Sequence, residues 1–351
     1  MNDKLTQTLI EIYSKAQKEL IKIIAEKEAR GNVTAYQKSL LMQIGQELAR
    51  LDNQARDVSY KIVERYYKEA IDEVSAILNT DIEESYKSFS KLHTNAIKIL
   101  AFNIYSNLNQ ANNFVGRRLN DAIRQAGIDA VAKKLATGQT VKECKKNLIS
   151  SLINEGINGI KDKRGRMISL DAYADIVARS TTAEVTNTAT INQLTCLGYD
   201  LVKMTSHATT CSICSIYQGR VYSISGNDGR FPKLSVAFSG EYANIHPRCR
   251  HRIFPYIPEL ADNFEKDIVD SNRSFEVDTR SKKAIDNYNK QQKEKVKLNN
   301  DRKQYQRYRL MFGKDAPKSF AGFRRMKYSN SGKYQELESE YRSIMIKESK
   351  A

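Results

Sequence analysis

The side chains best suited to chemistry gather in one stretch of the sequence, residues 207 to 251, which holds three of the five cysteines and three of the four histidines. A Cys-x-x-Cys pair, Cys211 and Cys214, is followed by a second knuckle, His246-Pro247-Arg248-Cys249-Arg250-His251. Two thiolates from the first knuckle and a thiolate and an imidazole from the second are typical ligands of a tetrahedral zinc ion. The sequence therefore predicts structural zinc bound by four of these five residues: Cys211, Cys214, His246, Cys249 and His251.

Two other interpretations of the cluster stay open. The side chains could pack and hydrogen-bond within a turn-rich fold without a metal. Alternatively, Cys211 or Cys214 could act as a nucleophile, with His207, His246 or His251 as the base. A thiol–imidazole pair needs neither a second cysteine nor a Cys-Arg-His knuckle, and the sequence shows no Gly-rich phosphate loop, paired catalytic carboxylates or nucleophile elbow. We therefore expect no enzymatic activity.

Positive charge is the second feature that could serve a function. The chain has 57 Lys and Arg against 41 Asp and Glu, a formal net charge of +16, which favours an anionic partner such as nucleic acid or an acidic protein surface. In an extended strand, the alternating arginines of the second knuckle would share one face. The candidate nucleic-acid or partner-binding residues are Arg248, Arg250, Arg252, Arg307 and Arg309.

The C-terminal basic segment, Ser281 to Leu310, could bind DNA by neutralising phosphates, with Tyr288, Tyr305 and Tyr308 stacking on exposed bases. Two structural alternatives are as consistent with the sequence. The knuckle arginines could be a charged strand edge that prevents unwanted pairing, and the basic segment could be a solvated helix face.

These candidates must be positioned by a largely helical chain. All five prolines follow residue 231, so the first two thirds can run as helix. Apolar residues step by three and four from Leu5 to Ile23 and from Leu41 to Ile62, which indicates two amphipathic helices that need a partner. Gly31-Asn32 and Asn79-Thr80 mark breaks between helices.

The sequence pattern of the central region differs from that of the helical first part. Ser169 can cap a helix that ends near Cys196-Leu197-Gly198. Short β-like segments follow, separated by glycine, proline and polar turns: Leu201–Met204, Val221–Ile224 and Arg252–Tyr256. We therefore predict an α+β protein that is mostly α. Its parts are a long helical N-terminal arm (residues 1–154), a small knuckle-containing α+β domain (155–260) and a basic, largely helical tail (261–351).

Membrane association is not expected. No apolar run approaches the ~20 residues that span a bilayer, and the first residues lack the apolar core of a secretory signal. Both observations predict synthesis in the cytoplasm.

Short blocks in the middle of the chain occur in a fixed order: Asp162–Arg166, Ser169–Tyr173, Ala178–Thr182, Leu197–Val202, Ser206–Ala208, Tyr217–Tyr222 and Cys249–His251, closing with Pro255-Tyr256. In this order they resemble the phage minor capsid protein 2 family. That family is related to the Mu F-like head-morphogenesis proteins, whose Cys-x-x-Cys and His-Pro-x-Cys-Arg-Cys knuckles resemble those of this chain. His251 stands where the Mu F-like proteins usually have a last cysteine.

The resemblance implies a minor head protein of a tailed phage or prophage that associates with the portal and acts in head morphogenesis, and that could act in DNA packaging or ejection. The implied partners are the portal protein, capsid or scaffold proteins and phage genomic DNA. The implied location is the virion, in the head interior or at the portal vertex, after assembly in the host bacterial cytoplasm. We expect the helical arm to dock by its apolar stripe. The alternative function is a zinc-dependent nucleic-acid enzyme or effector carried in the phage head.

Overall fold

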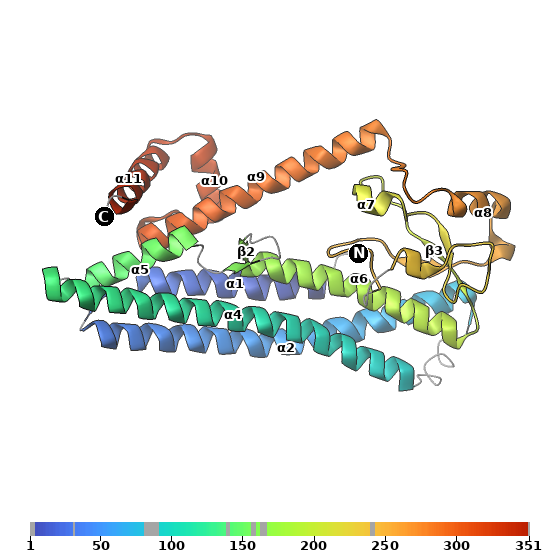
Figure 1. Cartoon of the computed structure of the whole chain (residues 1–351), viewed down its shortest axis with the longest axis horizontal. Coiled ribbons are helices and arrows are strands. Elements are labelled where there is room, and N and C mark those ends of the chain that lie inside the picture. The colour runs from blue at the N-terminus through green and yellow to red at the C-terminus, as the bar shows by residue number, and fades with distance from the viewer. Residues whose placement is uncertain are drawn as a thin grey trace. The chain divides into compact units, whose positions relative to one another are not determined.

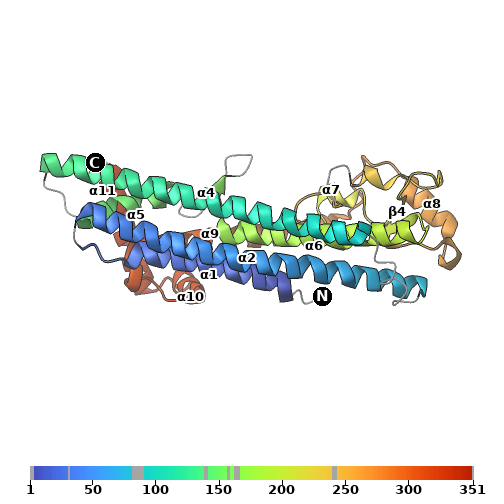
Figure 2. The ribbon, with the colours of Figure 1, turned by 90° about the horizontal axis from the view of Figure 1, so that it is seen from below.

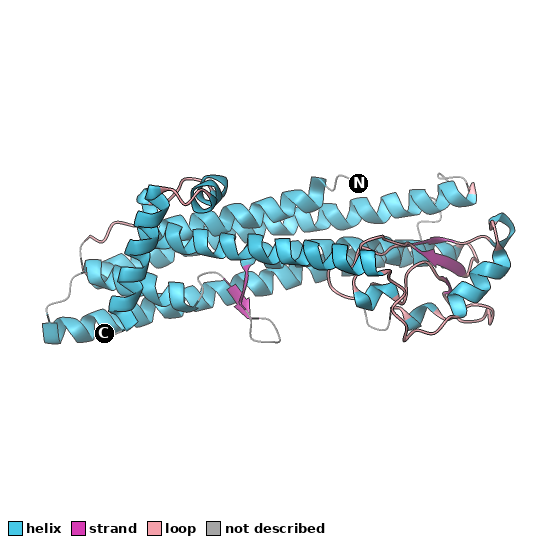
Figure 3. Cartoon of the chain, turned by 90° about the horizontal axis from the view of Figure 1, so that it is seen from above, coloured by secondary structure: helices cyan, strands magenta, loops and turns pink. Residues whose placement is uncertain are grey.

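The computed structural model describes residues 4–30, 32–80, 91–137, 141–155, 159–161, 167–238 and 243–349. Helices predominate and the few strands are short (Figures 1 and 3), which confirms the prediction of a mostly α protein with some α+β character. The helices are α1 (Lys4–Glu26), α2 (Val33–Leu78), α4 (Lys91–Thr137), α5 (Val141–Glu155), α6 (Leu170–Cys196), α7 (Ser212–Ser215), α8 (Phe264–Asn272), α9 (Lys282–Phe312), α10 (Phe320–Tyr328) and α11 (Gly332–Ser349). The strands are β1 (Gly159–Lys161), β2 (Met167–Ser169), β3 (Leu201–Met204), β4 (Val221–Ser223) and β5 (Ile253–Pro255).

The chain divides into two compact units whose boundaries fall within the long helices. The first comprises Met1–Ile10, Ala55–Leu108 and Ala174–Gln292, and the second comprises Glu11–Gln54, Asn109–Tyr173 and Lys293–Ala351. Each unit therefore combines segments that are far apart in the sequence. The division into arm, central domain and tail by sequence position stays a prediction.

Helices α2 and α4 lie side by side and run in opposite directions (Figure 2). In the second unit, the Gln37 side chain donates to the Ile123 carbonyl at 2.6 Å. In the first unit, the Tyr67 hydroxyl lies 3.0 Å from Nδ1 of His93. The positions of these pairs ascend along α2 and descend along α4, as an antiparallel helix pair requires.

The apolar stripes that the sequence predicts on α1 and α2 are buried within the chain. Leu9 and Leu20 of α1 and Leu51 and Ile62 of α2 are 0% exposed. Burying such side chains stabilises the fold by about 1.5–3 kcal/mol each, and a buried stripe is not available to a partner. The expectation that the arm docks by its apolar stripe is therefore wrong, because intramolecular packing already covers it.

The small antiparallel sheet has the strand order β4-β3-β5, and its strands confirm the three predicted β segments within one residue at each end. Because side chains alternate across a strand, Val202 and Met204 of β3 pack with Leu194 of α6. Leu201 packs on the opposite side, in a cluster that Phe264 of α8 also contacts. The sheet therefore lies between α6 and α8.

The helix that precedes the sheet ends as predicted. Gly198 has φ 78°, a left-handed conformation that favours glycine, and the Tyr199 N–H donates to the Leu194 carbonyl at 2.9 Å. Both predicted breaks between helices are present. Helix α1 ends at Glu26 and α2 begins at Val33, and α2 ends at Leu78, where Asn79 has φ 52°.

Helices α9, α10 and α11 enclose an aromatic core in the second unit. Tyr308, Phe323, Tyr334 and Leu337 form its buried centre, and Tyr308 is 1% exposed. Tyr305 packs against it. The expectation that these two tyrosines stack on bases is therefore wrong for Tyr308, whose ring is enclosed by its own chain.

One feature near the predicted domain boundary was not expected from the sequence. Strands β1 and β2 pair antiparallel, with Ile160 opposite Ile168, although no β segment was predicted before Leu201. Strands of three residues are too short to show a period. The block Asp162–Arg166 lies outside the described residues. Among the helices in the described part of the chain, none is long and apolar enough to cross a bilayer.

Candidate metal centre

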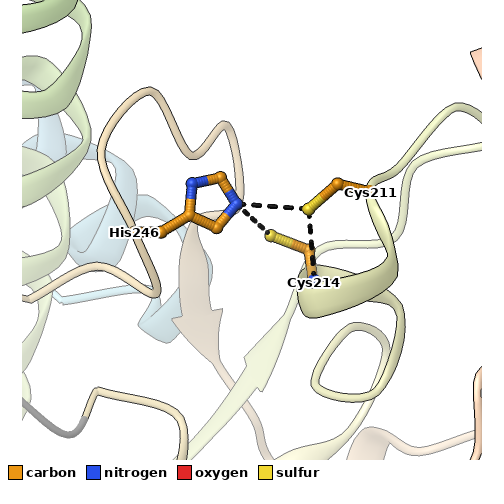
Figure 4. A group of neighbouring side chains, drawn as sticks. All are labelled: Cys211, Cys214 and His246. Carbon is orange, nitrogen blue, oxygen red and sulfur yellow. Dashed lines mark hydrogen bonds between the residues drawn. The ribbon is translucent and has the colours of Figure 1, made fainter. Parts of the chain in front are cut away.

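The first knuckle is a helical turn. Cys211 caps α7, and its sulfur accepts a hydrogen bond from the backbone N–H of Cys214 at 3.4 Å. A turn of this kind presents the sulfur atoms of both cysteines to one point, as Figure 4 shows.

His246 of the second knuckle faces both sulfur atoms (Figure 4). Its Nε2 lies 3.2 Å from Sγ of Cys211 and 3.0 Å from Sγ of Cys214. Its Nδ1 lies 2.8 Å from the carbonyl oxygen of Pro247. When neutral, an imidazole that donates from Nδ1 to this carbonyl carries its lone pair on Nε2, the arrangement in which a histidine binds a metal with its other nitrogen anchored.

Cys249 and His251 extend the cluster. Sγ of Cys249 lies 3.7 Å from Sγ of Cys214 and 3.4 Å from Nδ1 of His251. Nε2 of His251 lies 3.0 Å from Oε1 of Gln218, so this ring also has one nitrogen next to an oxygen and the other facing sulfur. The structure thus brings together all five predicted ligands, as two overlapping groups that share Cys214.

The separations of the ligand atoms suit a tetrahedral metal. Bonds of about 2.3 Å to sulfur and about 2.0 Å to nitrogen place ligand atoms roughly 3.5 to 3.8 Å apart. The Cys214–Cys249 separation of 3.7 Å lies in this range, and the two sulfur–His246 separations are slightly shorter. Cys214 is 2% exposed, and Cys249 and His251 are each 3% exposed. The group Cys214, Cys249 and His251 is therefore closed to solvent, as structural zinc sites are, whereas Cys211 and His246 are partly exposed.

The cluster also favours anionic sulfur. The hydrogen bond from Cys214 lowers the pKa of Cys211 to about 3, and Cys214 likewise lowers the pKa of Cys249 to about 4. The pKa of Cys214 is raised, first by its hydrogen bond to Cys211. The hydrogen bond to Cys211 raises the pKa of His246 to about 9. Cys214 therefore keeps its proton between two thiolates, and a metal would take the place of such protons.

Polar side chains of α6 hold the second knuckle in place. Ser180 Oγ accepts from the backbone N–H of Arg248 at 2.8 Å, and Asp175 forms an ion pair with the guanidinium of the same residue. Asn187 donates to the Ala243 carbonyl at 2.7 Å and accepts from the Ile253 N–H at 3.1 Å. Sequence reasoning missed these residues; the only signal was the block Ala178–Thr182, which contains Ser180.

The three knuckle arginines do not share a strand face. Arg248 lies in a turn with φ 63°, Arg250 donates to the Thr209 carbonyl at 2.8 Å, and Arg252 precedes β5, which begins only at Ile253. The predicted alternation is absent because Arg248 adopts a left-handed turn and the strand begins only after Arg252. Arg248 and Arg250 are also used in contacts within the chain.

The two candidate arginines of the tail differ from each other. Arg307 is exposed on α9. Arg309 donates to the Gly313 carbonyl at 2.9 Å and lies 3.2 Å from Oε1 of Glu26. Of the two, Arg307 is the more accessible to an external partner.

Sequence reasoning also missed Arg220, a buried residue that fixes the chain beside the sheet. Its side chain is 0% exposed, and its guanidinium donates to the carbonyl oxygens of Ser271, Arg273 and Ser274. The guanidinium carbon lies 3.9 Å from the ring centroid of Phe275. Arg220 and Gln218 both belong to the block Tyr217–Tyr222, which was the available signal.

Comparison with known proteins identifies the family. The model of the family described as Phage minor capsid protein 2 matches residues 2–307. Neither a curated protein nor a solved structure matches the chain. The match extends over the N-terminal helices, which carry no diagnostic motif of their own, and reaches α9. The chain therefore belongs to the phage minor capsid protein 2 family, which assigns it a role in the phage head.

Proposed function

We propose that this chain is a portal-associated minor head protein of a tailed phage or prophage that acts in head morphogenesis. The observation that carries the proposal is the family match over residues 2–307, which supports a place among phage head components. The long antiparallel helices and the sheet between α6 and α8 support an architectural role. The proposed location is the head interior or the portal vertex.

A face of α4 supports docking to a partner such as the portal. Leu92, Ile99 and Phe102 are 45%, 60% and 66% exposed. Their spacing of seven and three residues places them on one face of the helix. Large apolar side chains gathered at the surface of a helix are typical of protein–protein contacts. This face replaces the buried stripes of α1 and α2 as the proposed docking surface.

Incorporation into procapsids tests this surface. Portal, scaffold and major capsid protein are co-expressed with the chain, and the purified particles are analysed for its content. We expect the wild-type chain to be retained and the double variant Ile99→Glu/Phe102→Glu to be lost. A matched double variant, Thr94→Glu/Asn107→Glu, adds the same charge at exposed positions on the two flanks of the same helix and should be retained. Particles that never contain the wild-type chain would contradict the portal assignment.

The same proposal includes a structural zinc ion held by Cys211, Cys214, His246 and Cys249. The contacts of His246 Nε2 with two sulfur atoms favour it over His251 as the fourth ligand. Elemental analysis should find about one zinc per chain. His246→Ala should lose it and His251→Ala should keep it, whereas the reverse result would assign the fourth position to His251. Metal-free wild-type protein with unchanged melting would remove zinc and leave the head assignment intact.

The alternative of a zinc-dependent nucleic-acid enzyme needs an open coordination position for water or substrate. Two of the four proposed ligands, Cys214 and Cys249, are almost fully buried, which favours the closed, structural site. A nuclease assay on the purified protein separates the two functions. Activity that disappears in Cys249→Ala while the fold is retained would establish the enzyme.

DNA contact and the relation to the Mu F-like proteins remain proposals. The net charge of +16 supports DNA binding, and Arg248, Arg250, Arg252, Arg307 and Arg309 stay predicted contact residues. Phosphate contacts release counterions, so DNA affinity should fall steeply as salt rises.

A further inference from the structure

A cavity in the second unit is lined by more basic than acidic side chains. It encloses about 270 Å³ and is lined by residues of α1 and α9, the start of α6, and the turn before α10. Its cationic residues are Lys18, Lys22, Arg302, Arg309 and Lys318, and its acidic residues are Glu19 and Asp171. Basic side chains around a partly enclosed space concentrate a positive potential there.

Both acidic side chains of the cavity have partners within the chain. Asp171 accepts from Ser169 Oγ at 2.5 Å and from the Ala172 N–H at 2.8 Å, contacts that belong to the start of α6. Glu19 lies 3.7 Å from Lys22. Asp171 keeps its negative charge despite these hydrogen bonds, so the lining has five cations against two carboxylates.

Three cations of the cavity have no acidic partner. Arg309 is paired with Glu26, but within the described residues Lys18, Arg302 and Lys318 form no ion pair. The guanidinium of Arg302 lies 5.6 Å from the ring centroid of Phe320, which restrains it at the aromatic wall.

The wall of the cavity offers hydrogen bonds as well as charge. Gln17, Tyr305 and Gln306 line it, and Gln17 is 2% exposed. Burial raises the pKa of Tyr305, so its hydroxyl remains a donor at neutral pH. The volume of about 270 Å³ is slightly below the roughly 300–1,000 Å³ of ligand pockets. The space suits a small group with several acceptor oxygens.

We propose that this cavity binds a phosphate group through Arg302, Lys18 and Lys318. A phosphate presents three or four acceptor oxygens and negative charge, which guanidinium and ammonium groups bind by charge-assisted hydrogen bonds. The group comes either from a free phosphate or nucleotide or from the end of a DNA strand. The site is independent of portal association.

Calorimetric titration of the full chain with inorganic phosphate at constant ionic strength tests the site. Arg302→Gln should weaken binding about tenfold or more, as expected for loss of a charge-assisted contact, and Lys318→Gln, at an exposed position, should weaken it in the same direction. The control is Lys61→Gln, which removes one positive charge at an exposed position of α2 that does not line the cavity and should leave the affinity unchanged. Circular dichroism verifies the fold of each variant.

Two oligonucleotides then identify the source of the phosphate. Tighter binding of a 5′-phosphorylated strand than of the same strand with a 5′-hydroxyl, with the difference lost in Arg302→Gln, would identify a DNA end. Equal binding of both strands, together with binding of inorganic phosphate and deoxyadenosine monophosphate, would identify a free phosphate ligand. Wild-type protein that binds none of the phosphates, or equal weakening by Arg302→Gln and Lys61→Gln, would overturn the proposal.

Discussion

Two regions of this chain each bury a charged side chain, and they satisfy it in opposite ways. In the sheet module, defined as residues 201–275, Arg220 is 0% exposed and is bound by backbone carbonyls and an aromatic ring. In the C-terminal helices α9 to α11, Asp301 is 1% exposed and accepts from Arg324 at 3.1 Å, Lys327 at 2.7 Å and Tyr328 at 2.6 Å. The sheet module stabilises the charge of Arg220 mainly with backbone carbonyl dipoles. The C-terminal helices stabilise the charge of Asp301 with side chains that reach solvent.

The difference reflects how each region is held together. The sheet strands are three or four residues long, so the sheet module has little repetitive secondary structure and joins distant loops through Arg220 and the Cys/His cluster. The C-terminal helices instead share an aromatic core around Tyr308 and Phe323. The stability of the sheet module should therefore depend mainly on individual directional contacts. The stability of the C-terminal helices should depend mainly on buried apolar area.

Removal of the proposed zinc ion should give the largest effect. Because a structural zinc ion contributes its binding free energy to folding, we expect a strong chelator to destabilise the sheet module by on the order of 5 kcal/mol, less than the roughly 10–16 kcal/mol of isolated zinc fingers. Hydrogen exchange by mass spectrometry should show loss of protection in residues 201–256 and unchanged protection in α9 to α11. Equal loss in both regions would remove the distinction.

Phe323→Ala should affect the other region. The side chain is 0% exposed in the aromatic core, and truncation of a buried phenylalanine costs about 3–5 kcal/mol. Protection should fall in α9 to α11, with the zinc content unchanged. Val296→Ala on α9, where the side chain is 58% exposed, should change the stability by less than about 0.5 kcal/mol.

Arg220→Met should lower the free energy of unfolding by about 2–3 kcal/mol, because three carbonyl oxygens lose a charged donor. Arg220→Lys keeps the charge but lacks the planar fork, so we expect it to recover less than half of the loss. Denaturant unfolding followed by circular dichroism measures both, with Lys266→Met at an exposed position of α8 as the control. Full recovery by lysine would show that charge alone matters.

Asp301→Asn should give the smallest effect and a dependence on pH. Burial opposes the charged carboxyl, but hydrogen bonds from Lys327, Tyr328 and Arg324 outweigh it and lower its pKa. The stabilisation is therefore present above the usual carboxyl pKa of about 4 and is lost as pH falls through the lower pKa of the folded state. We expect Asp301→Asn to lower the free energy of unfolding by about 1–2 kcal/mol at pH 7.

Urea unfolding of the wild type and Asp301→Asn at neutral and acidic pH measures this difference. The two stabilities should converge as the pH falls below about 4. Arg220 should contribute no such dependence because a guanidinium remains charged. A constant gap between wild type and variant at every pH would show that the carboxyl charge is not the stabilising element.

Local pattern and residue type determined much of this molecule. The three-and-four steps of apolar residues predicted α1 and α2, and the segment Leu201–Met204 was predicted with the bounds that β3 has. The cysteines and histidines of the two knuckles could be chosen as candidate ligands because their types are scarce and their spacing is regular. Such signals depend only on neighbours along the chain, so the sequence reveals them directly.

Tertiary structure decided which surfaces face solvent and which polar groups meet. The α1 and α2 stripes have the same pattern whether they face another protein or another helix of this chain, and only the fold shows that they are buried. Arg220 donates to carbonyls more than fifty positions away, and Asn187 donates to the Ala243 carbonyl 56 positions away, just before the second knuckle. Contacts between distant residues depend on the path of the whole backbone, which no local period encodes.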